Sequence, residues 1–354
     1  MNIVVVKFGG TSVATEEGRR RAISHITSLH SKGKNVVVVV SAMGRKGAPY
    51  ATDTLISLLN KNSEQHTLDL LMSCGEVISA CVFADNLVQQ GLDAIAITGG
   101  QAGIVTNGIF GKADIFDIDE KRIKAELYEG KVVVVTGFQG VSIRNEVTTL
   151  GRGGSDTSAV VIGGFLKAEA VHIFTDVPGI AVIDPRVVSR ARFMEYVDMQ
   201  HMYTLACWGA GVIHPRAIAE AQKHDIDVYV RSTFDDGPGT KLIKNCKLDY
   251  GPLGIAVLRE CELFEPNEYD DLIISNSMGK RAVRALSDSK KSLLSVVFSG
   301  YNEEEIMDVT RDFPEITDYF FSKFCVHIFV ESEQVEIIAN KLYNKLFENV
   351  LSNA

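Results

Sequence analysis

Runs of β-branched and other apolar residues recur along the chain, and more polar stretches separate them. The runs are Ile3–Val6, Val36–Val40, Ala94–Thr98, Val132–Thr136, Val171–Thr175 and Val228–Val230. Each run is hydrophobic almost without interruption, which is typical of a strand buried on both faces of a sheet. The pattern therefore predicts a central sheet with both faces covered.

Helix-like stretches lie between these runs. Over residues 16–33, Ala22, Ile23, Ile26 and Leu29 fall on one face of a predicted helix. Further helices are predicted at residues 68–91, 119–130 and 155–166. Strands that alternate with helices predict an α/β fold, in which a mostly parallel sheet is sandwiched between helices.

The texture of the sequence changes near Cys246. Gly251, Pro252 and Gly254 predict a linker, and a second pattern of elements follows it. There, "SLLSVVFSG" and "KFCVHIFVE" predict strands, whereas "NEEEIMDVTRDFP" and "EQVEIIANKLYNKLFENV" predict helices. We therefore predict two domains, residues 1–247 and residues 248–354, of which the second is a small α+β module for regulation or dimerisation.

Composition narrows the class of protein. The 354 residues carry a net charge of −9, which argues against binding to nucleic acid or to an anionic membrane. The six cysteines form no C-x-x-C pair, as in a reduced cytosolic protein. Lys7 interrupts the first apolar run, so the N-terminus does not resemble a signal peptide. We expect a soluble, cytoplasmic protein.

The first apolar run leads into "KFGGTS". Lys7 lies at the carboxyl end of the predicted strand, where ligands bind in open α/β sheets. Gly9 and Gly10 would let backbone N–H groups approach an anion, and Lys7 would supply a charge for a phosphoryl oxygen. The alternative interpretation is an ordinary Gly-Gly turn with a solvated lysine.

A second glycine-rich stretch, "TTLGRGGSDTSAVVIGG", precedes a predicted helix. Ser155 is a suitable N-cap, and the free N–H groups behind it attract anions. Arg152 can bind a carboxylate through two parallel hydrogen bonds. Asp156 could orient Lys7 or reach a metal-bound water; alternatively it is a first-turn acid that complements the helix dipole.

A third stretch, "FTDVPGIAVIDPR", follows another strand. Thr175 and Asp176 fall at the end of that strand, whereas Asp184 and Arg186 either contribute to a site or simply stabilise their own turn. Three such loops in one alternating α/β unit favour phosphate chemistry over ordinary turns.

Other residues indicate a second ligand. Ser41 ends a strand, and Thr52 follows it in the same loop region. Glu76 lies among apolar neighbours, where an ammonium partner would offset the cost of burying its charge. The alternative for Glu76 is a partly exposed helix residue. We interpret His214, which precedes a proline, as structural.

Together these motifs resemble those of aspartokinases, in the amino acid kinase superfamily. The resemblance rests on "VVKFGGTSVA", "VVVVVSAMG", the Gly75-Glu76 pair, "TLGRGGSDTSA", "FTDVPGI..IDPR" and "GAGVIHPRA", which follow the family's order over residues 1 to about 243. It implies the amino acid kinase fold and ATP-dependent phosphorylation of the side-chain carboxylate of L-aspartate, as the entry step to lysine, threonine and methionine biosynthesis.

The resemblance also implies roles for individual residues. Lys7 and Asp156 would be catalytic, and Asp156 would also reach Mg²⁺ through water. The residues that would bind aspartate are Ser41, Thr52, Glu76, Arg152 and Ser155. Those that would bind ATP are Lys7, Phe8, Gly9, Gly10, Thr175, Asp176, Asp184, Arg186 and Gly211.

The chain departs from the family pattern in two places. Ala181, Val182 and Ile183 replace an aromatic residue and two threonines, and the aromatic residue looks like an adenine-stacking one. In addition, residues 248–354 are too few for the two ACT-type domains of typical members. We therefore expect one shortened ACT-like module that mediates formation of a homodimer or higher homo-oligomer, and reduced or absent feedback control.

Three functional hypotheses follow. The first is an aspartate kinase, the second is a kinase for an aspartate analogue in a specialised pathway, and the third is a kinase-like protein that binds a ligand or partner but turns over poorly. The apolar residues at 181–183 favour the third hypothesis. The complete charged set of Lys7, Arg152, Asp156 and Asp176 argues against it.

Overall fold

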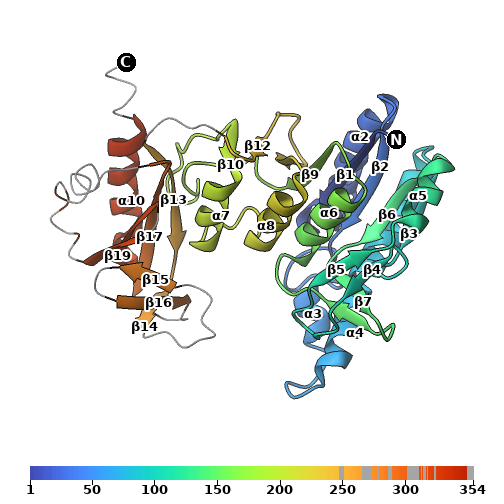
Figure 1. Cartoon of the computed structure of the whole chain (residues 1–354), viewed down its shortest axis with the longest axis horizontal. Helices are drawn as coiled ribbons and strands as arrows, with labels where there is room; N and C mark the ends of the chain where they lie inside the picture. Colours follow the sequence, from blue (N-terminus) through green and yellow to red (C-terminus); the bar gives the residue numbers. More distant parts are fainter. Residues whose placement is uncertain are drawn as a thin grey trace. The chain divides into compact units, whose positions relative to one another are not determined.

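The computed structural model of the chain divides into two compact units (Figure 1). It describes residues 1–246, 251–264, 273–276, 279–285, 289–300, 318–322 and 324–348, and the single positions 311, 313 and 316. The first unit consists of Met1–Gly179 and Arg216–Lys244. The second consists of Ile180–Pro215 and the residues from Asn245 onward. The sequence predicts a boundary at residue 247, whereas the second unit includes both the residues from Asn245 onward and residues 180–215.

The first unit is built on a mostly parallel sheet. Its strands run in the order β12 (Thr240–Ile243), β11 (Val228–Ser232), β9 (Ala170–Thr175), β1 (Ile3–Phe8), β2 (Asn35–Val40), β6 (Val132–Thr136) and β3 (Ala94–Ile97). Neighbouring strands are parallel except that β12 runs antiparallel to β11. The predicted fold class is confirmed. The ends of each strand predicted for this sheet differ by at most two residues from the ends of an observed strand.

Helices cover both faces of this sheet. One hydrophobic cluster joins α2 (Glu16–Ser31) and α4 (Gln65–Gln89) to alternate residues of β1, among them Val4, Val6 and Phe8. Because successive strand side chains point to opposite faces, Val5 and Lys7 face α6 (Gly154–Phe165), which contacts β1 from the other side. The remaining helices are α1 (Gly10–Ala14), α3 (Thr52–Ile56), α5 (Lys121–Tyr128) and α8 (Pro215–His224).

A smaller sheet in the first unit does not follow from the hydrophobic pattern. Its order is β5 (Ile115–Ile118), β4 (Ile104–Thr106), β7 (Gln139–Ser142) and β8 (Val147–Thr149). These strands are only three or four residues long, so their period is too short to recognise in the sequence. The last of them, β8, packs against α4 and leads into the glycine-rich stretch before α6.

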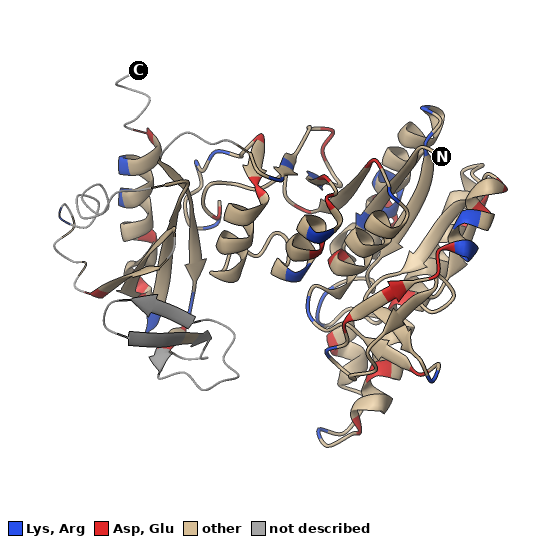
Figure 2. Ribbon diagram, in the orientation of Figure 1, with Lys and Arg blue, Asp and Glu red and all other residues tan. Residues whose placement is uncertain are grey.

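Helix α4 is long and apolar. Its length and hydropathy alone would allow it to cross a membrane, a test that core helices of soluble proteins also pass. In this structure α4 packs against β3, β6 and β8, and its buried side chains include Asp69 and Glu76. Positive and negative side chains are interspersed over the first unit (Figure 2).

The second unit contains two antiparallel sheets. One has the order β13 (Pro252–Leu258), β17 (Lys291–Phe298), β19 (Cys325–Glu331) and β18 (Asp318–Ser322), and the other has the order β14 (Cys261–Phe264), β16 (Gly279–Ala285) and β15 (Ile273–Asn276). The unit also contains β10 (Tyr196–Asp198), α7 (Met199–Cys207), a 3₁₀ turn at Ser332–Gln334, α10 (Val335–Tyr343) and a π-helical turn at Asn344–Glu348.

Two predicted strands and the terminal helix of the C-terminal region are confirmed, as β17, β19 and α10. Most of the predicted helix "NEEEIMDVTRDFP" lies outside the described residues. The small sheets are consistent with an ACT-like module. Residues 180–215 contribute to the same hydrophobic cluster as β17, β19 and α10, through Val182, Ile183 and Val188.

Candidate active site

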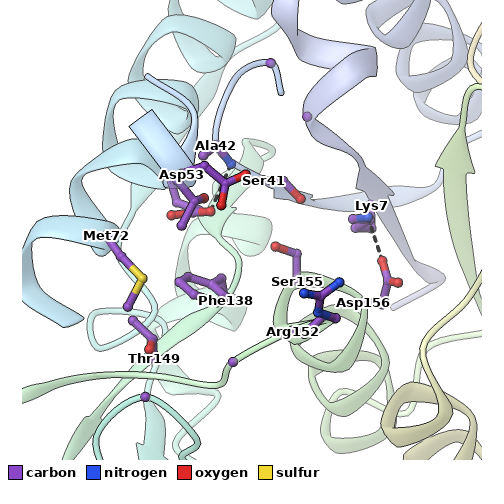
Figure 3. Close-up of a pocket in the computed structure, with 18 of the residues that line it drawn as sticks. Lys7, Ser41, Ala42, Asp53, Met72, Phe138, Thr149, Arg152, Ser155 and Asp156 are labelled. Atoms are coloured by element: carbon purple, nitrogen blue, oxygen red, sulfur yellow. Dashed lines mark hydrogen bonds and ion pairs between the residues drawn. The ribbon is translucent and has the colours of Figure 1, made fainter. Parts of the chain in front are cut away.

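A cleft of about 600 Å³ opens at the carboxyl ends of β1 and β2 in the first unit (Figure 3). Many of the residues that the sequence predicts for catalysis and substrate binding line it: Lys7, Gly10, Ser41, Thr52, Glu76, Arg152, Ser155 and Asp156. Ser41, Ala42 and Asp53 lie on one side, across the cleft from Arg152 and Ser155 (Figure 3). Segments more than 100 residues apart in sequence therefore meet at this strand edge.

Lys7 and Asp156 form an ion pair inside the cleft. Lys7 Nζ lies 2.6 Å from Asp156 Oδ1, and both side chains are nearly buried, at 12% and 13% exposed. The geometry follows from local structure, because Lys7 faces α6 and Asp156 lies in the first turn of that helix. The alternative of a solvated lysine is therefore wrong, and Asp156 both orients the lysine and complements the helix dipole.

The glycines after β1 permit a close approach of two loops. A Cβ on Gly10 would lie 2.6 Å from the Gly44 carbonyl oxygen and 2.7 Å from that of Ala42. Gly44 also donates its N–H to the Gly10 carbonyl oxygen, at 3.0 Å. The side chain of Phe8 belongs to the core, where it stacks on Phe174 with ring centroids 4.9 Å apart, so it does not line the cleft.

The start of α6 differs from the sequence prediction. Ser155 is not the N-cap of the helix; Gly153 holds that position, with φ of 71°. A left-handed residue there suits glycine, which carries no Cβ to clash. Ser155 lies one residue inside the helix, buried and lining the cleft. The helix N-terminus still faces the cleft, so its partial positive charge favours a bound anion.

Glu76 is a buried acid at the wall of the cleft. Its side chain is 2% exposed, so the alternative of a partly exposed helix residue is wrong. Oε1 accepts the N–H of Ala42 at 2.9 Å, whereas no described protein group pairs with the buried Oε2. Burial raises the pKa of Glu76 to about 8, with the Ala42 N–H opposing the shift. Such a carboxyl group favours a cationic partner.

Arg152 offers the opposite charge to the same cleft. It is exposed, lies between the left-handed Gly151 and Gly153, and forms no ion pair with any described residue. An unpaired guanidinium in a cleft suits a carboxylate or a phosphate. Glu76 and Arg152 thus present one site for a cation and one for an anion.

The residues predicted for the nucleotide are divided between the two units. At the end of β9, Thr175 Oγ donates to Asp176 at 3.1 Å, and Arg45 pairs with Asp176 at 2.7 Å. In the second unit, Arg186 binds both carboxylate oxygens of Asp184 and so stabilises its own turn. Gly211 also belongs to the second unit. Their roles in nucleotide binding remain predictions.

Several residues of the cleft were not predicted from the sequence. They include Gln65, Asp69, Met72, Phe138 and Thr149, of which Asp69 lies behind the wall and the others line it. Asp69 could have been recognised, because a second acid lies seven residues before Glu76 on one apolar helix. Thr149 and Phe138 could not, because Thr149 ends the short strand β8 and Phe138 lies in the bend between β6 and β7, and neither segment has a clear sequence pattern.

A mostly parallel sheet with a strand-end cleft that contains a lysine defines a class of protein. The model of the amino acid kinase family matches residues 2–232 of the chain. The fold also matches E. coli aspartokinase III, with a TM-score of 0.80 and 23% identity over 98% of this chain and 100% of the other. The aspartate kinase of Synechocystis matches with a TM-score of 0.61 and 27% identity, over 97% and 69% of the two chains.

Sequence relatives identify the particular family. Aspartokinase 1 of Bacillus subtilis is 46% identical over 68% of this chain and 60% of its own length. The aspartokinase of Bacillus sp. strain MGA3 is 35% identical over 90% of this chain and 80% of its own length. The chain belongs to the aspartokinases of the amino acid kinase family. It spans about 60% of the length of the first relatives that it matches.

Proposed function

We propose that the chain is an aspartate kinase, which transfers the γ-phosphoryl group of ATP to the side-chain carboxylate of L-aspartate. The observation that carries the proposal is the pairing, in one cleft, of the buried Glu76 with its unpartnered oxygen and the unpaired Arg152. An α-amino acid supplies the two complementary charges. The aspartokinase relatives support aspartate as that amino acid.

In this proposal the substrate is bound by its ammonium and α-carboxylate groups. Glu76 receives the ammonium group and Arg152 the α-carboxylate, while the hydroxyl groups of Ser41, Thr52 and Ser155 supply further hydrogen bonds. The side-chain carboxylate then faces Lys7. Because the ammonium and α-carboxylate groups are both held, the side-chain carboxylate is fixed in one direction. This orientation lowers the entropic cost of reaching the transition state.

The chemistry requires charge stabilisation rather than a base. The side-chain carboxylate of aspartate, with a pKa of about 3.9, is already ionised at neutral pH. One of its oxygens attacks the γ-phosphorus as the bond to the leaving ADP oxygen breaks, giving 4-phospho-L-aspartate and ADP. Lys7, oriented by Asp156, and the N-termini beside Gly10 and Gly153 stabilise the charge on the transferring group.

Mg²⁺ fits this arrangement as a partner of the nucleotide. The described residues contain no group of three metal-ligating side chains, and Mg²⁺ is commonly held by one or two carboxylates and the substrate phosphates. We assign Asp156 to reach the ion through water. The ion would neutralise the phosphate charge when ATP is bound.

The nucleotide site of the first unit is proposed to use Gly9, Gly10, Thr175 and Asp176, with Phe8 contributing through its backbone. E. coli aspartokinase III, which shares the fold, was solved in complex with aspartate and ADP. The residues at 181–183 have a structural reason to be apolar, because Val182 and Ile183 are buried in the core of the second unit. We further propose a cytoplasmic homodimer or higher homo-oligomer that assembles through the C-terminal module.

A hydroxamate assay tests the proposal directly. Purified protein with Mg²⁺-ATP and L-aspartate should form an acyl phosphate that hydroxylamine traps, and omission of aspartate should abolish the product. Lys7→Met, which keeps an unbranched side chain one atom shorter and removes the charge, should lose at least about a hundredfold in kcat. Addition of lysine or threonine tests the expected lack of feedback control.

Two outcomes would contradict the proposal. Faster turnover of an aspartate analogue than of aspartate would favour a specialised amino acid kinase. Binding of ATP without any acyl phosphate would favour a kinase-like binding protein.

A further inference from the structure

Asp69 is a fully buried carboxylate behind the substrate cleft. It lies on α4, is 0% exposed, and has no cation among its hydrogen-bond partners in the described part of the chain. Burying a charge without a counter-ion is costly unless hydrogen bonds compensate for the lost water. A carboxylate buried without a cationic partner therefore indicates a role beyond packing in the core.

Four donors compensate Asp69, and three of them come from distant segments. Oδ2 accepts the N–H groups of Gly111 at 2.8 Å and of Thr149 at 2.7 Å. Oδ1 accepts the Thr149 hydroxyl at 3.0 Å and the Gln65 amide at 3.1 Å. Gly111, Thr149 and Gln65 all line the cleft. One side chain thus connects two segments of the cleft, the loop at Gly111 and the end of β8, to α4.

The second of these segments leads to Arg152. Thr149 is three residues before it, and the intervening Leu150 is fully buried. Gly151 packs so closely on the other loop that a Cβ there would lie 2.9 Å from the Gly111 carbonyl oxygen. The segment that presents Arg152 is therefore held from both sides by groups that Asp69 binds.

Asp69 also has a fixed relation to Glu76. The two residues are seven positions apart on α4, which places them on one face of the helix and about 10 Å apart along its axis. The same rigid helix therefore carries the acid for the ammonium group and anchors the segment with the arginine for the carboxylate. The spacing between the two charges is set by α4.

We propose that Asp69 is a positioning residue that sets the separation of Glu76 and Arg152, and thereby the selectivity for an α-amino acid of the size of aspartate. The inference rests on the proposed function. Asp69 does not touch the substrate; it holds the carboxylate-binding segment in register with the ammonium-binding acid. The nucleotide residues Gly9, Gly10, Thr175 and Asp176 lie on other segments.

Asp69→Asn tests the role with minimal change of shape. An amide has one oxygen, so it can accept from only one pair of the four donors, and its NH₂ group faces the other pair. We expect the KM for aspartate to rise about tenfold or more, the KM for ATP to stay within about twofold, and kcat to fall less than the KM rises. If the variant does not fold, Thr149→Val, which removes one hydroxyl bond, should raise the KM for aspartate alone by a smaller factor.

Glu126→Gln is the matched control. Glu126 is another buried acid of the first unit, on α5, paired with Lys131 at 2.8 Å and Arg122 at 2.7 Å. We expect this variant to lower the melting temperature without moving either KM. An Asp69→Asn enzyme that melts earlier but keeps the wild-type KM for aspartate would overturn the positioning role and leave the proposed function intact. A wild-type protein that neither binds nor phosphorylates aspartate would instead overturn the proposed function, and this inference with it.

Discussion

At the scale of single residues, the chemistry of the cleft depends on whether each buried ionisable group has a partner. Lys7 and Asp156 are both nearly buried, and each is the other's partner in an ion pair at 2.6 Å. Glu76 loses water without a partner for one of its oxygens, so the pKa of its carboxyl group rises to about 8. The free protein therefore holds a proton on Glu76 at neutral pH, and an arriving ammonium group must displace that proton.

This exchange predicts a pH dependence for the use of aspartate. Below a pH of about 8 most Glu76 is protonated in the free protein, so kcat/KM for aspartate should rise by up to about tenfold per pH unit from pH 6 and level off near 8. Steady-state rates at saturating ATP, from pH 6 to 9, measure the profile. Glu76→Gln cannot ionise and should give low values without that rise; an equal slope in this variant would assign the titration to another group.

At the scale of elements, the cleft depends on how closely the loop after β1 approaches the loop after β2. Gly10 allows this approach because a side chain there would meet two carbonyl oxygens of the neighbouring loop. The second loop also contains Ala42, whose N–H binds Glu76. The phosphate side and the substrate side of the cleft are therefore coupled through one glycine.

Gly10→Ala should consequently disturb both ligands. We expect the added methyl group to push the loops apart, raise the KM for aspartate and the KM for ATP, and lower kcat/KM by about a hundredfold. Gly33→Ala is a suitable control, because Gly33 has φ of 73° and no atom within 4 Å of its Cβ position. That control should cost about 1 kcal/mol of stability with unchanged kinetics. Equal kinetic effects in the two variants would show that general destabilisation is the cause.

At the scale of the whole molecule, each unit has its own core and its own buried groups. The second unit encloses His327, whose ring nitrogens bond to the hydroxyl groups of Ser295 at 2.9 Å and Ser322 at 2.6 Å. The ring centroids of Trp208 and His327 lie 4.3 Å apart. Burial lowers the pKa of His327 to about 3, because an imidazolium ion would lose its hydration there.

The second unit should therefore be sensitive to acid. Between pH 6.5 and 3 the unfolded chain binds a proton at His327 that the folded unit excludes, so stability falls as the pH falls, by roughly 2 kcal/mol between pH 7 and pH 5. Trp208 is the only tryptophan of the chain, so its fluorescence during urea unfolding reports on this unit. His327→Asn should reduce the pH dependence, whereas His30→Gln, at an exposed position, should not. An unchanged slope in His327→Asn would refute the role of this histidine.

The sequence by itself determined the central sheet, most of the helices and the strand-end motifs, because these depend on periodicity and on residue types that are local in the chain. Lys7, Arg152 and Asp156 could be singled out for the same reason. The Lys7–Asp156 distance, the orphaned oxygen of Glu76 and the anchoring by Asp69 arise only when segments tens to more than 100 residues apart are brought together. The packing of residues 180–215 within the second unit was likewise decided by tertiary structure, because a linear division of the sequence cannot represent a chain that leaves one core, enters another and returns.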